Sequence, residues 1–191
     1  MTVRRSSETV EYLDIVDILT GEPTGETVER SRAHLEGIPH RTAHVWIYRR
    51  HCGRIQLLLQ KRCAAKDSFP GCYDVSSAGH IPAGTDYITS ALRELKEELG
   101  VEAQAEELTL CGSRRIIFDT VFHERPFHDR QYTRVFALCR EGDEISFVPQ
   151  PEEIESVMWI DYEECIGKVH DLDFQNCLDT DDLKMIGEKI L

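Results

Sequence analysis

The order of hydrophobic and polar residues predicts paired strands in the first part of the chain. Residues 42–50, TAHVWIYRR, and residues 54–62, RIQLLLQKR, are aliphatic, aromatic and β-branched runs separated by a His-Cys-Gly turn, so they predict a β-hairpin. The nearly continuous IQLLL stretch is typical of a buried strand. Short apolar stretches around the turn-forming TGEPTG predict another hairpin, an N-terminal extension at about residues 10–30.

A helix is predicted in the middle of the chain. Asp86 is a favourable N-cap residue and Gly100 is a typical helix stop, so the helix should run to Leu99. At about 100° per residue, its apolar side chains fall on one stripe that should be buried: Ile88, Ala91, Leu92, Leu95 and Leu99. Three carboxylates fall on a second stripe, roughly a third of a turn away: Glu94, Glu97 and Glu98.

The remaining segments predict further strands and two more helices. The expected elements are strands at 108–122 and 132–140, a strand followed by a short helix at 155–169, and a C-terminal helix at 179–191. The segments expected to be irregular are a connector at 31–41, a loop at 63–74 and a polar, histidine-rich loop at 123–131. This order favours an α/β or α+β fold with a mixed sheet over regular βαβ units, in a single domain spanning 1–191.

Composition and charge exclude several functional classes. The net charge of −13 argues against a nucleic-acid-binding protein, which would need a basic stripe. No apolar run approaches membrane-spanning length, and no apolar stretch follows the N-terminal arginines as in a secretory signal. The seven cysteines are scattered without a C-x-x-C pair, which predicts free thiols in a reducing cytoplasm. A homodimer is compatible with this composition.

The three helical glutamates need an explanation, because like charges at this spacing repel by a few tenths of a kcal/mol each. A divalent cation that prefers oxygen ligands, Mg²⁺ or Mn²⁺, would relieve that repulsion at the edge of a cleft. The alternative is a solvated helix face on which Arg93 and Lys96 pair with the glutamates.

The residues around these glutamates resemble the Nudix box. Gly79, then Arg93-Glu94-Leu95, then Glu97-Glu98 and finally Gly100-Val101 stand at the spacing of that motif. The first glutamate of the box is replaced by Thr85, with Asp86 beside it. The resemblance implies a Nudix-type α/β/α sandwich and Mg²⁺-dependent hydrolysis of a diphosphate linkage in a nucleoside diphosphate derivative or a similar small phosphorylated substrate.

The resemblance also implies roles for individual residues. Glu94, Glu97 and Glu98 would bind the divalent metal, Arg93 would hold a carboxylate by a charge-assisted bond, and Gly79 would let the backbone approach metal and diphosphate. A carboxylate would accept a proton from the attacking water. The candidates for this base are Glu94 on the helix and three loop glutamates, Glu124, Glu152 and Glu153, each of which could equally be a solvated side chain.

A second resemblance covers the chain from the N-terminal hairpin to Gly100, and more loosely to Ile160. It is similar to the Nudix subgroup related to type 1 isopentenyl-diphosphate isomerase, whose histidine ligands imply a second metal site at His34, His40 and His80. Two departures disfavour isomerase activity. The catalytic cysteine of the isomerases is replaced by Ala78, and Asp129 and Gln131 stand where the isomerases have glutamates.

The substrate contacts are less determined. Positively charged residues on or beside predicted strands could reach phosphates or could be solvated surface charges: Lys61, Arg62, Arg114, Arg115 and Arg134. Trp46, Tyr73 and Phe118 could stack on a base or belong to the core. Besides the hydrolase, two alternatives therefore stay open: an isomerase-like enzyme and a non-catalytic nucleotide-binding domain.

Overall fold

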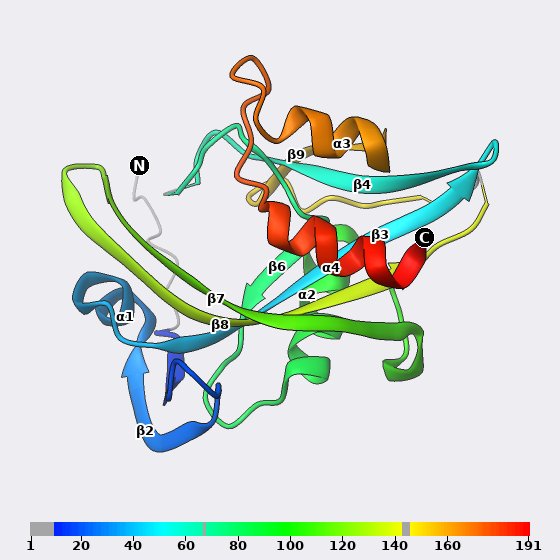
Figure 1. Cartoon of the computed structure of the whole chain (residues 1–191). Coiled ribbons are helices and arrows are strands. Elements are labelled where there is room, and N and C mark those ends of the chain that lie inside the picture. Colours follow the sequence, from blue (N-terminus) through cyan, green and yellow to red (C-terminus); the bar gives the residue numbers. More distant parts are fainter. Residues whose placement is uncertain (1–9, 67, 143–145) are drawn as a thin grey trace, which may run out of the picture.

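The computed structural model describes residues 10–66, 68–142 and 146–191 and contains strands and helices in mixed order (Figure 1). The strands are β1 (Tyr12–Val16), β2 (Pro23–Glu29), β3 (His40–His51), β4 (Arg54–Arg62), β5 (Tyr73–Asp74), β6 (Ser77–His80), β7 (Leu108–Phe122), β8 (Arg125–Cys139) and β9 (Ile154–Asp161). The helices are α1 (Arg30–Glu36), α2 (Tyr87–Leu99), α3 (Tyr162–Lys168) and α4 (Thr180–Ile190), with a short 3₁₀ turn at Ala105–Glu107.

The main sheet has seven strands and is mixed. Its central path runs β5-β4-β3-β8-β7, while β6 pairs with β3 and β9 pairs with β4. Only the β3–β8 pair is parallel among the described strands. The predicted α+β fold with a mixed sheet is therefore confirmed.

Strand β3 has two different neighbours along one edge. Its first half pairs with β6, in the register of Thr42 with His80, and its last residues pair with β4, in the register of Tyr48 with Leu57. The predicted hairpin of β3 and β4 thus exists, but the two strands stay paired only over its closed end. Farther from the turn β4 is no longer paired with β3, which opens the sheet on the side where the candidate site lies, while β9 pairs along the other edge of β4 from Gln56 to Arg62.

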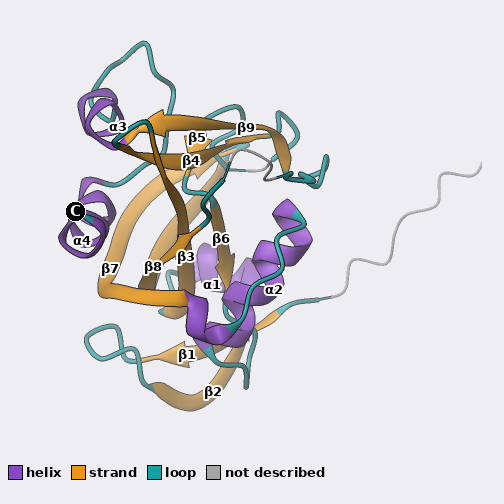
Figure 2. Ribbon diagram, turned by 90° about the vertical axis from the view of Figure 1, so that its right-hand side faces the viewer, coloured by secondary structure: helices purple, strands orange, loops and turns teal. Residues whose placement is uncertain are grey.

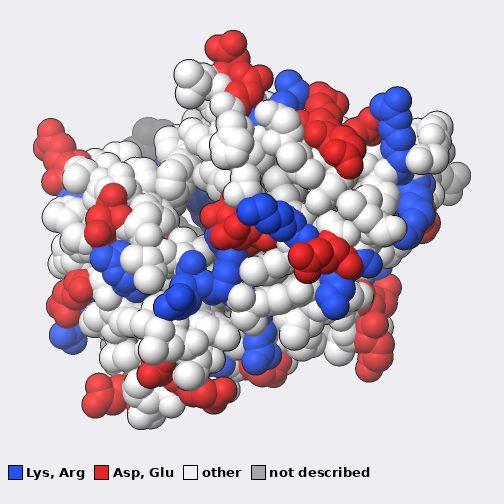
Figure 3. Space-filling model, in the orientation of Figure 1, with Lys and Arg blue, Asp and Glu red and all other residues white. Residues whose placement is uncertain are grey.

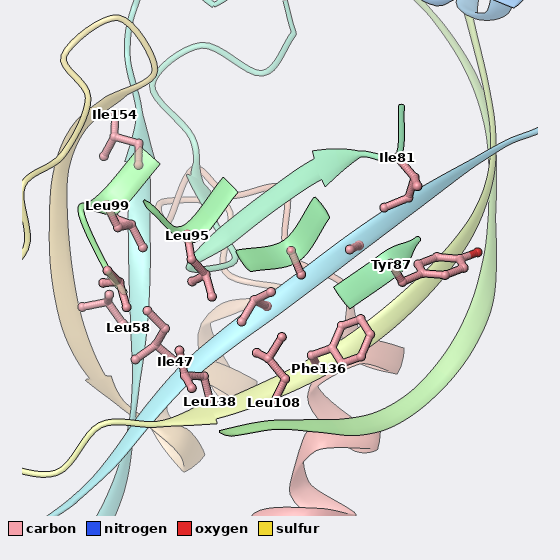
Figure 4. Packing of buried hydrophobic residues seen from close by; sticks show 14 residues of the cluster. Ile47, Leu58, Ile81, Tyr87, Leu95, Leu99, Leu108, Phe136, Leu138 and Ile154 are labelled. Atoms are coloured by element: carbon pink, nitrogen blue, oxygen red, sulfur yellow. The ribbon is translucent and has the colours of Figure 1, made fainter. Parts of the chain in front are cut away.

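The helices cover opposite faces of this sheet. In Figure 2, α2 lies on one side of β3, β6 and β8, and α3 and α4 lie on the other. Helix α2 packs Ala91, Leu95 and Leu99 onto a core that includes Ile47 and Phe136 (Figure 4), as its apolar stripe predicts. The opposite core joins α3 and α4 to other strand residues through a separate set of side chains, which includes Trp46, Leu57, Leu59, Leu183 and Ile186. The leucines of the IQLLL stretch are fully buried, as predicted.

Both ends of α2 are fixed as the sequence predicts. The Asp86 side chain accepts a hydrogen bond from the Thr89 backbone N–H at 2.9 Å, which satisfies one of the free donors of the first turn. Gly100 closes the helix in the left-handed conformation with φ of 68°, where a side chain would be strained. The helix register that positions the carboxylates is therefore fixed at both termini.

The structure corrects three predictions of irregular structure. The connector at 31–41 contains most of helix α1, which is too short for periodicity to reveal and buries Ala33 against Leu13 and Val28 of the β1–β2 hairpin. The loop at 123–131 is mostly strand β8, because only His123 and Glu124 form the turn, both with positive φ. The loop at 63–74 ends in the short strand β5.

The N-terminal hairpin at 10–30 is present as β1 and β2, which pair antiparallel. In the described residues, each helix is too short or too polar to cross a lipid bilayer.

Two helical glycines give a matched test of the packing between α3 and α4. A Cβ atom at Gly187 would overlap the hydroxyl of Tyr162, which donates a hydrogen bond to the Leu183 carbonyl at 2.9 Å, whereas a Cβ atom at Gly167 would meet no atom. We expect Gly187→Ala to lower the free energy of unfolding by about 1–3 kcal/mol through overpacking. Gly167→Ala should raise it by roughly 0.5–1 kcal/mol, because alanine has the higher helix propensity. Urea denaturation measures both, and an increase in both variants would contradict the packing described.

Candidate active site

A cavity of about 970 Å³ opens where β4 and β6 separate along β3. Its walls come from the face of β3, β6 and β8 opposite α2, from the loop after β4, from the β7–β8 hairpin and from the start of α4. The polar and charged residues that line it include His34, Thr42, His44, Arg62, Lys66, Asp74, His80, Glu98, Arg114, Asp129, Gln131, Glu153 and Asp182.

Glu98 reaches this cavity from the last turn of α2 and is 8% exposed. Its Oε2 atom accepts a hydrogen bond from the Ser77 hydroxyl at 2.7 Å, and its backbone carbonyl accepts one from the Gln150 N–H at 2.8 Å. Burial raises the pKa of Glu98 to about 8, against the lowering effect of the Ser77 hydrogen bond, and the neighbouring Glu94 carboxylate adds a smaller increase. Without a cation, this carboxyl therefore keeps its proton at neutral pH.

Glu94 lies one turn earlier on the same helix face, against bare backbone. A Cβ atom at Gly79 would overlap the Glu94 side chain, so glycine is what lets strand β6 pass directly beside this carboxylate. The Arg93 Nη2 atom donates to Glu94 Oε1 at 2.6 Å. Burial nevertheless raises the pKa of Glu94 to about 7.

Glu97 differs from the other two glutamates because its side chain is 54% exposed. It accepts a hydrogen bond from Arg93 Nη1 at 3.2 Å, and Arg93 thus bridges Glu94 and Glu97. The predicted stripe of three carboxylates therefore divides into the buried Glu98, the partly buried Glu94 and one residue at the rim. Glu94 and Glu98 are two carboxylates with raised pKa values, and Gly79 leaves the backbone of β6 bare beside them. They form a fitting oxygen-donor set for Mg²⁺.

Three histidines from α1, β3 and β6 meet at a second place in the cavity wall, where His34 and His80 line the cavity and His40 is buried behind them. One nitrogen of each of His34, His40 and His80 lies within 4.8 Å of the others. Burial lowers the pKa of His34 to about 3 and that of His40 to about 4, so the rings are neutral and able to act as ligands. The Asp129 Oδ1 atom on β8 lies 3.8 Å from His34 Nε2 and 4.0 Å from His40 Nε2.

Two buried atoms of this cluster lack a hydrogen-bond partner in the described structure: His40 Nε2 and Asp129 Oδ1. Buried polar atoms without a partner are energetically costly. These two atoms lie 4.0 Å apart within the histidine cluster, where one bound metal ion would satisfy both. Three imidazoles and one carboxylate are a donor set for Mn²⁺, Fe²⁺, Co²⁺ or Zn²⁺ rather than for Mg²⁺. The histidines predicted from sequence are thus brought together, and Asp129 joins them.

The structure separates the candidate phosphate-binding residues. Arg62 and Arg114 line the cavity, where Arg62 pairs with Asp74 at 2.9 Å and Arg114 pairs with Asp179 at 2.6 Å and Asp182 at 2.7 Å. Both guanidinium groups are therefore largely committed to carboxylates of the protein.

The other candidate cations lie elsewhere. Lys61 pairs with Glu155 at 2.8 Å and is not among the residues of the cavity wall, and Arg115 is exposed. Arg134 lies over the Tyr87 ring, 4.3 Å from its centroid, in a separate pocket of about 320 Å³. These positions favour a surface or packing role for the three residues.

The aromatic and acidic candidates are also distributed unevenly. Phe118 lines the cavity, Trp46 is fully buried at its floor, and Tyr73 stacks on Phe174 with ring centroids 4.8 Å apart. Of the loop glutamates, Glu152 and Glu153 line the cavity, with Glu153 paired to Lys66. Glu124 is at the turn between β7 and β8 and is exposed.

Several residues of the cavity could not be assigned from the sequence. Asp182 belongs to an acidic run that resembles an ordinary helix start, and nothing in that run marks it as buried. His44 did have a signal. Thr42 and His44 alternate with the apolar residues Ala43 and Val45 in a strand, and residues two apart share one face of a sheet.

Comparisons with known proteins identify relatives of this chain. A family model described as the NUDIX domain matches residues 38–176. Nudix hydrolase 3 of Arabidopsis thaliana is 39% identical over 153 residues, which are 78% of this chain but only 19% of that protein's length. An uncharacterized Nudix hydrolase of Clostridium acetobutylicum is 34% identical over 81% of this chain and 71% of its own length. An isopentenyl-diphosphate Delta-isomerase of Corynebacterium diphtheriae is 25% identical, over 81% of each chain.

Solved structures show the same fold at lower sequence identity. DR0079 of Deinococcus radiodurans superposes with a TM-score of 0.63 at 19% identity and covers 93% of this chain and 98% of its own. The NUDIX domain of NrtR from Shewanella oneidensis, solved in complex with ADP ribose, gives a TM-score of 0.58 at 14% identity, with coverage of 79% and 88%.

The buried carboxyl of Glu98 predicts a pH-dependent stability in the presence of EDTA. Because its pKa of about 8 exceeds the usual value of 4.5, the folded state retains a proton that the unfolded chain releases between these values, so stability should fall as pH rises. Glu98→Gln carries no such proton and should gain in melting temperature over the wild type from pH 5 to pH 9. The rim variant Glu97→Gln is the control and should keep the wild-type profile. Parallel profiles for Glu98→Gln and the wild type would contradict the burial of an ionisable group here.

Proposed function

The chain belongs to the Nudix family, and from this premise we propose that it is a Mg²⁺-dependent hydrolase of a diphosphate linkage in a nucleoside diphosphate derivative or a similar substrate. The observation that carries the proposal is the pair of Glu98, which is buried and lines a large cavity, and Glu94, which is partly buried against Gly79 of the same cavity wall. Desolvation of two carboxylates is costly unless a cation compensates it, so the pair is explained by metal binding.

Glu94 and Glu98 would hold the metal, with Glu97 available at the rim. Bound there, Mg²⁺ or Mn²⁺ supplies charge neutralisation for the diphosphate and acidifies a water molecule. The protein fixes the ligands beforehand: Ser77 holds the Glu98 carboxyl, Gln150 holds its backbone, and Arg93 holds Glu94. Such fixed ligands lose little reorganisation energy when the substrate reacts.

The proton acceptor that we favour is Glu153. It lines the cavity, and its negative charge contributes to the raised pKa of Glu98, which places it near the carboxylate pair. Its backbone is anchored because the Cys63 N–H donates to the Glu153 carbonyl at 2.9 Å. Lys66, now paired with Glu153, would bind a substrate phosphate and thereby release the carboxylate for proton transfer. As water forms its bond to phosphorus, the bond to the bridging oxygen breaks and Glu153 takes the water proton.

Isomerisation of isopentenyl diphosphate is a second candidate function, favoured by the histidine cluster with Asp129 and by the isomerase relative. The residues at the reacting positions do not support it. Ala78 has no acidic proton, and Gln131 is a neutral amide that accepts from Thr42 Oγ1 at 3.0 Å and donates to Asp129 Oδ2 at 2.9 Å. A purely binding function is disfavoured because it would not require the buried glutamate pair.

The cellular setting that we propose is the cytoplasm, supported by seven cysteines that are all free thiols. The substrate would be a small phosphorylated molecule and not a nucleic acid. On the face drawn in Figure 3, acidic and basic side chains alternate without a continuous basic stripe. A homodimer stays a prediction.

A phosphate-release assay over a panel of nucleoside diphosphate derivatives, with and without Mg²⁺, tests the hydrolase proposal. We expect Mg²⁺-dependent turnover that Glu98→Gln reduces by roughly a thousandfold, since several kcal/mol of charge stabilisation are lost. Glu97→Gln should be affected less because that side chain is at the rim. Wild-type turnover by Glu98→Gln at saturating Mg²⁺, or dimethylallyl diphosphate formed from isopentenyl diphosphate above a blank, would count against the proposal.

Titration with Co²⁺ tests the proposed second metal site at His34, His40 and His80. We expect visible absorption bands of protein-bound Co²⁺, and we expect His80→Gln to weaken binding by more than about tenfold. His123→Gln, at the exposed turn between β7 and β8, is the matched control. If His80→Gln and His123→Gln bound Co²⁺ equally, the histidine cluster would be a hydrogen-bonded core feature only.

A further inference from the structure

His44 occupies a place in the cavity that neither candidate metal site uses. It lies on β3 between His40, which belongs to the histidine cluster, and Trp46, which is buried under α4. These three residues are separated by four and two positions, both even numbers, so their side chains leave the same face of the strand. The His44 side chain is 15% exposed and lines the cavity.

Asp182 of α4 fixes the orientation of the His44 ring. The Nδ1 atom donates to Asp182 Oδ2 at 2.7 Å, and Trp46 Nε1 donates to the same oxygen at 3.2 Å. The Arg114 Nε atom lies 2.7 Å from the other oxygen, Oδ1. Asp182 itself is 1% exposed, so three side chains from β3 and β7 surround a carboxylate with almost no contact with water. With Nδ1 engaged in this bond, Nε2 is the ring nitrogen that remains for a ligand in the cavity.

The ion pairs around His44 contain one more carboxylate than guanidinium groups. Two arginines, Arg62 and Arg114, pair here with three aspartates: Asp74, Asp179 and Asp182. Asp129 on β8 adds to the negative side. A protonated His44 compensates the excess. Burial alone would lower the pKa of His44, but the field of Asp182 and its hydrogen bond raise it above the ordinary value, with a smaller effect from Asp74 and opposition from Arg114.

His44 also lies opposite the strand segment that touches the glutamate pair. In the β3–β6 ladder His44 is the partner of Ala78, and directly opposed strand residues are about 5 Å apart. Ser77, on one side of Ala78, donates to Glu98, and Gly79, on the other side, contacts Glu94. The short side chain of Ala78 leaves the cavity open between the ring and this segment.

We propose that His44 is a phosphate-binding residue that, with Nδ1 fixed by Asp182, donates a hydrogen bond from Nε2 to a phosphate oxygen of the substrate. The role of this phosphate in catalysis rests on the proposed hydrolase function, but the anion site does not. An imidazolium held in one orientation gives a charge-assisted hydrogen bond to phosphate. A neutral ring with its proton on Nδ1 would instead present a lone pair to the anion. The alternative is that His44 and Asp182 only tie β3 to α4.

Binding of methylenediphosphonate, measured by calorimetry in EDTA and again in Mg²⁺, tests this assignment. We expect His44→Gln to weaken binding by at least tenfold, or about 1.4 kcal/mol, at pH 6. The ratio of the wild-type and variant affinities should shrink as pH rises to 8.5, because the wild-type ring loses its proton. His170→Gln, on an exposed turn outside the cavity, is the control and should bind as the wild type does. Equal affinity of His44→Gln and the wild type at pH 6 overturns the assignment.

A second measurement guards against variants that only lose stability. In the wild type labelled with ¹⁵N-histidine, the His44 Nε2 resonance should shift on addition of the diphosphonate, and a structural tie would leave it unchanged. Asp182→Asn, if folded, should lose the pH-dependent part of the affinity. Hydrolysis of the substrate panel without any effect of His44→Gln on binding would overturn this inference alone. Binding that depends on His44 without any hydrolysis would overturn the proposed function alone.

Discussion

The arrangement of the candidate active site depends on the desolvation of two carboxylates on one helix. The hydrophobic contacts that hold α2 on the sheet, through Leu95 and Leu99, also fix the rotation of the helix, and this rotation buries Glu98 and partly buries Glu94. Their raised pKa values measure how unfavourable the charged forms are there. Burial of this kind is stable in the charged form only with a compensating cation, so in the proposed function packing and metal binding are parts of one arrangement.

Strand β3 connects this helix to the rest of the cavity. Its residues alternate between two faces, so Val45 and Ile47 pack under α2 while Thr42 and His44 line the cavity on the opposite side. Because β4 and β6 follow one another along the same edge of β3, the sheet opens where these polar residues lie. The opening gives a substrate access to both the glutamate pair and the histidines without removing any strand from the core.

The parts of this arrangement that follow from local sequence could be predicted. The apolar stripe of α2, its caps at Asp86 and Gly100, and the spacing of Gly79, Glu94 and Glu98 all follow from residues close together in the chain. The division of the glutamates could not be predicted, because the exposure of Glu97 depends on neighbours far away in sequence. The same holds for Asp182, whose burial depends on His44 and Arg114. His44 is 138 residues away from Asp182 in the chain. Helix α1 was missed because Ala33 is stabilised by Leu13 and Val28 and not by its own periodicity.

The two sides of the cavity have opposite electrostatic needs. In the proposed function the ionised glutamate pair favours a cation, whereas a protonated His44 and Lys66 favour an anion. A metal ion alone would satisfy the first and a phosphate alone the second, and either one would leave charge uncompensated on the other side. A diphosphate that carries a divalent cation supplies both charges in one ligand. The pairing of Lys66 with Glu153 and of Asp182 with His44 and Arg114 can then be understood as the way in which the free protein balances these charges before such a ligand enters.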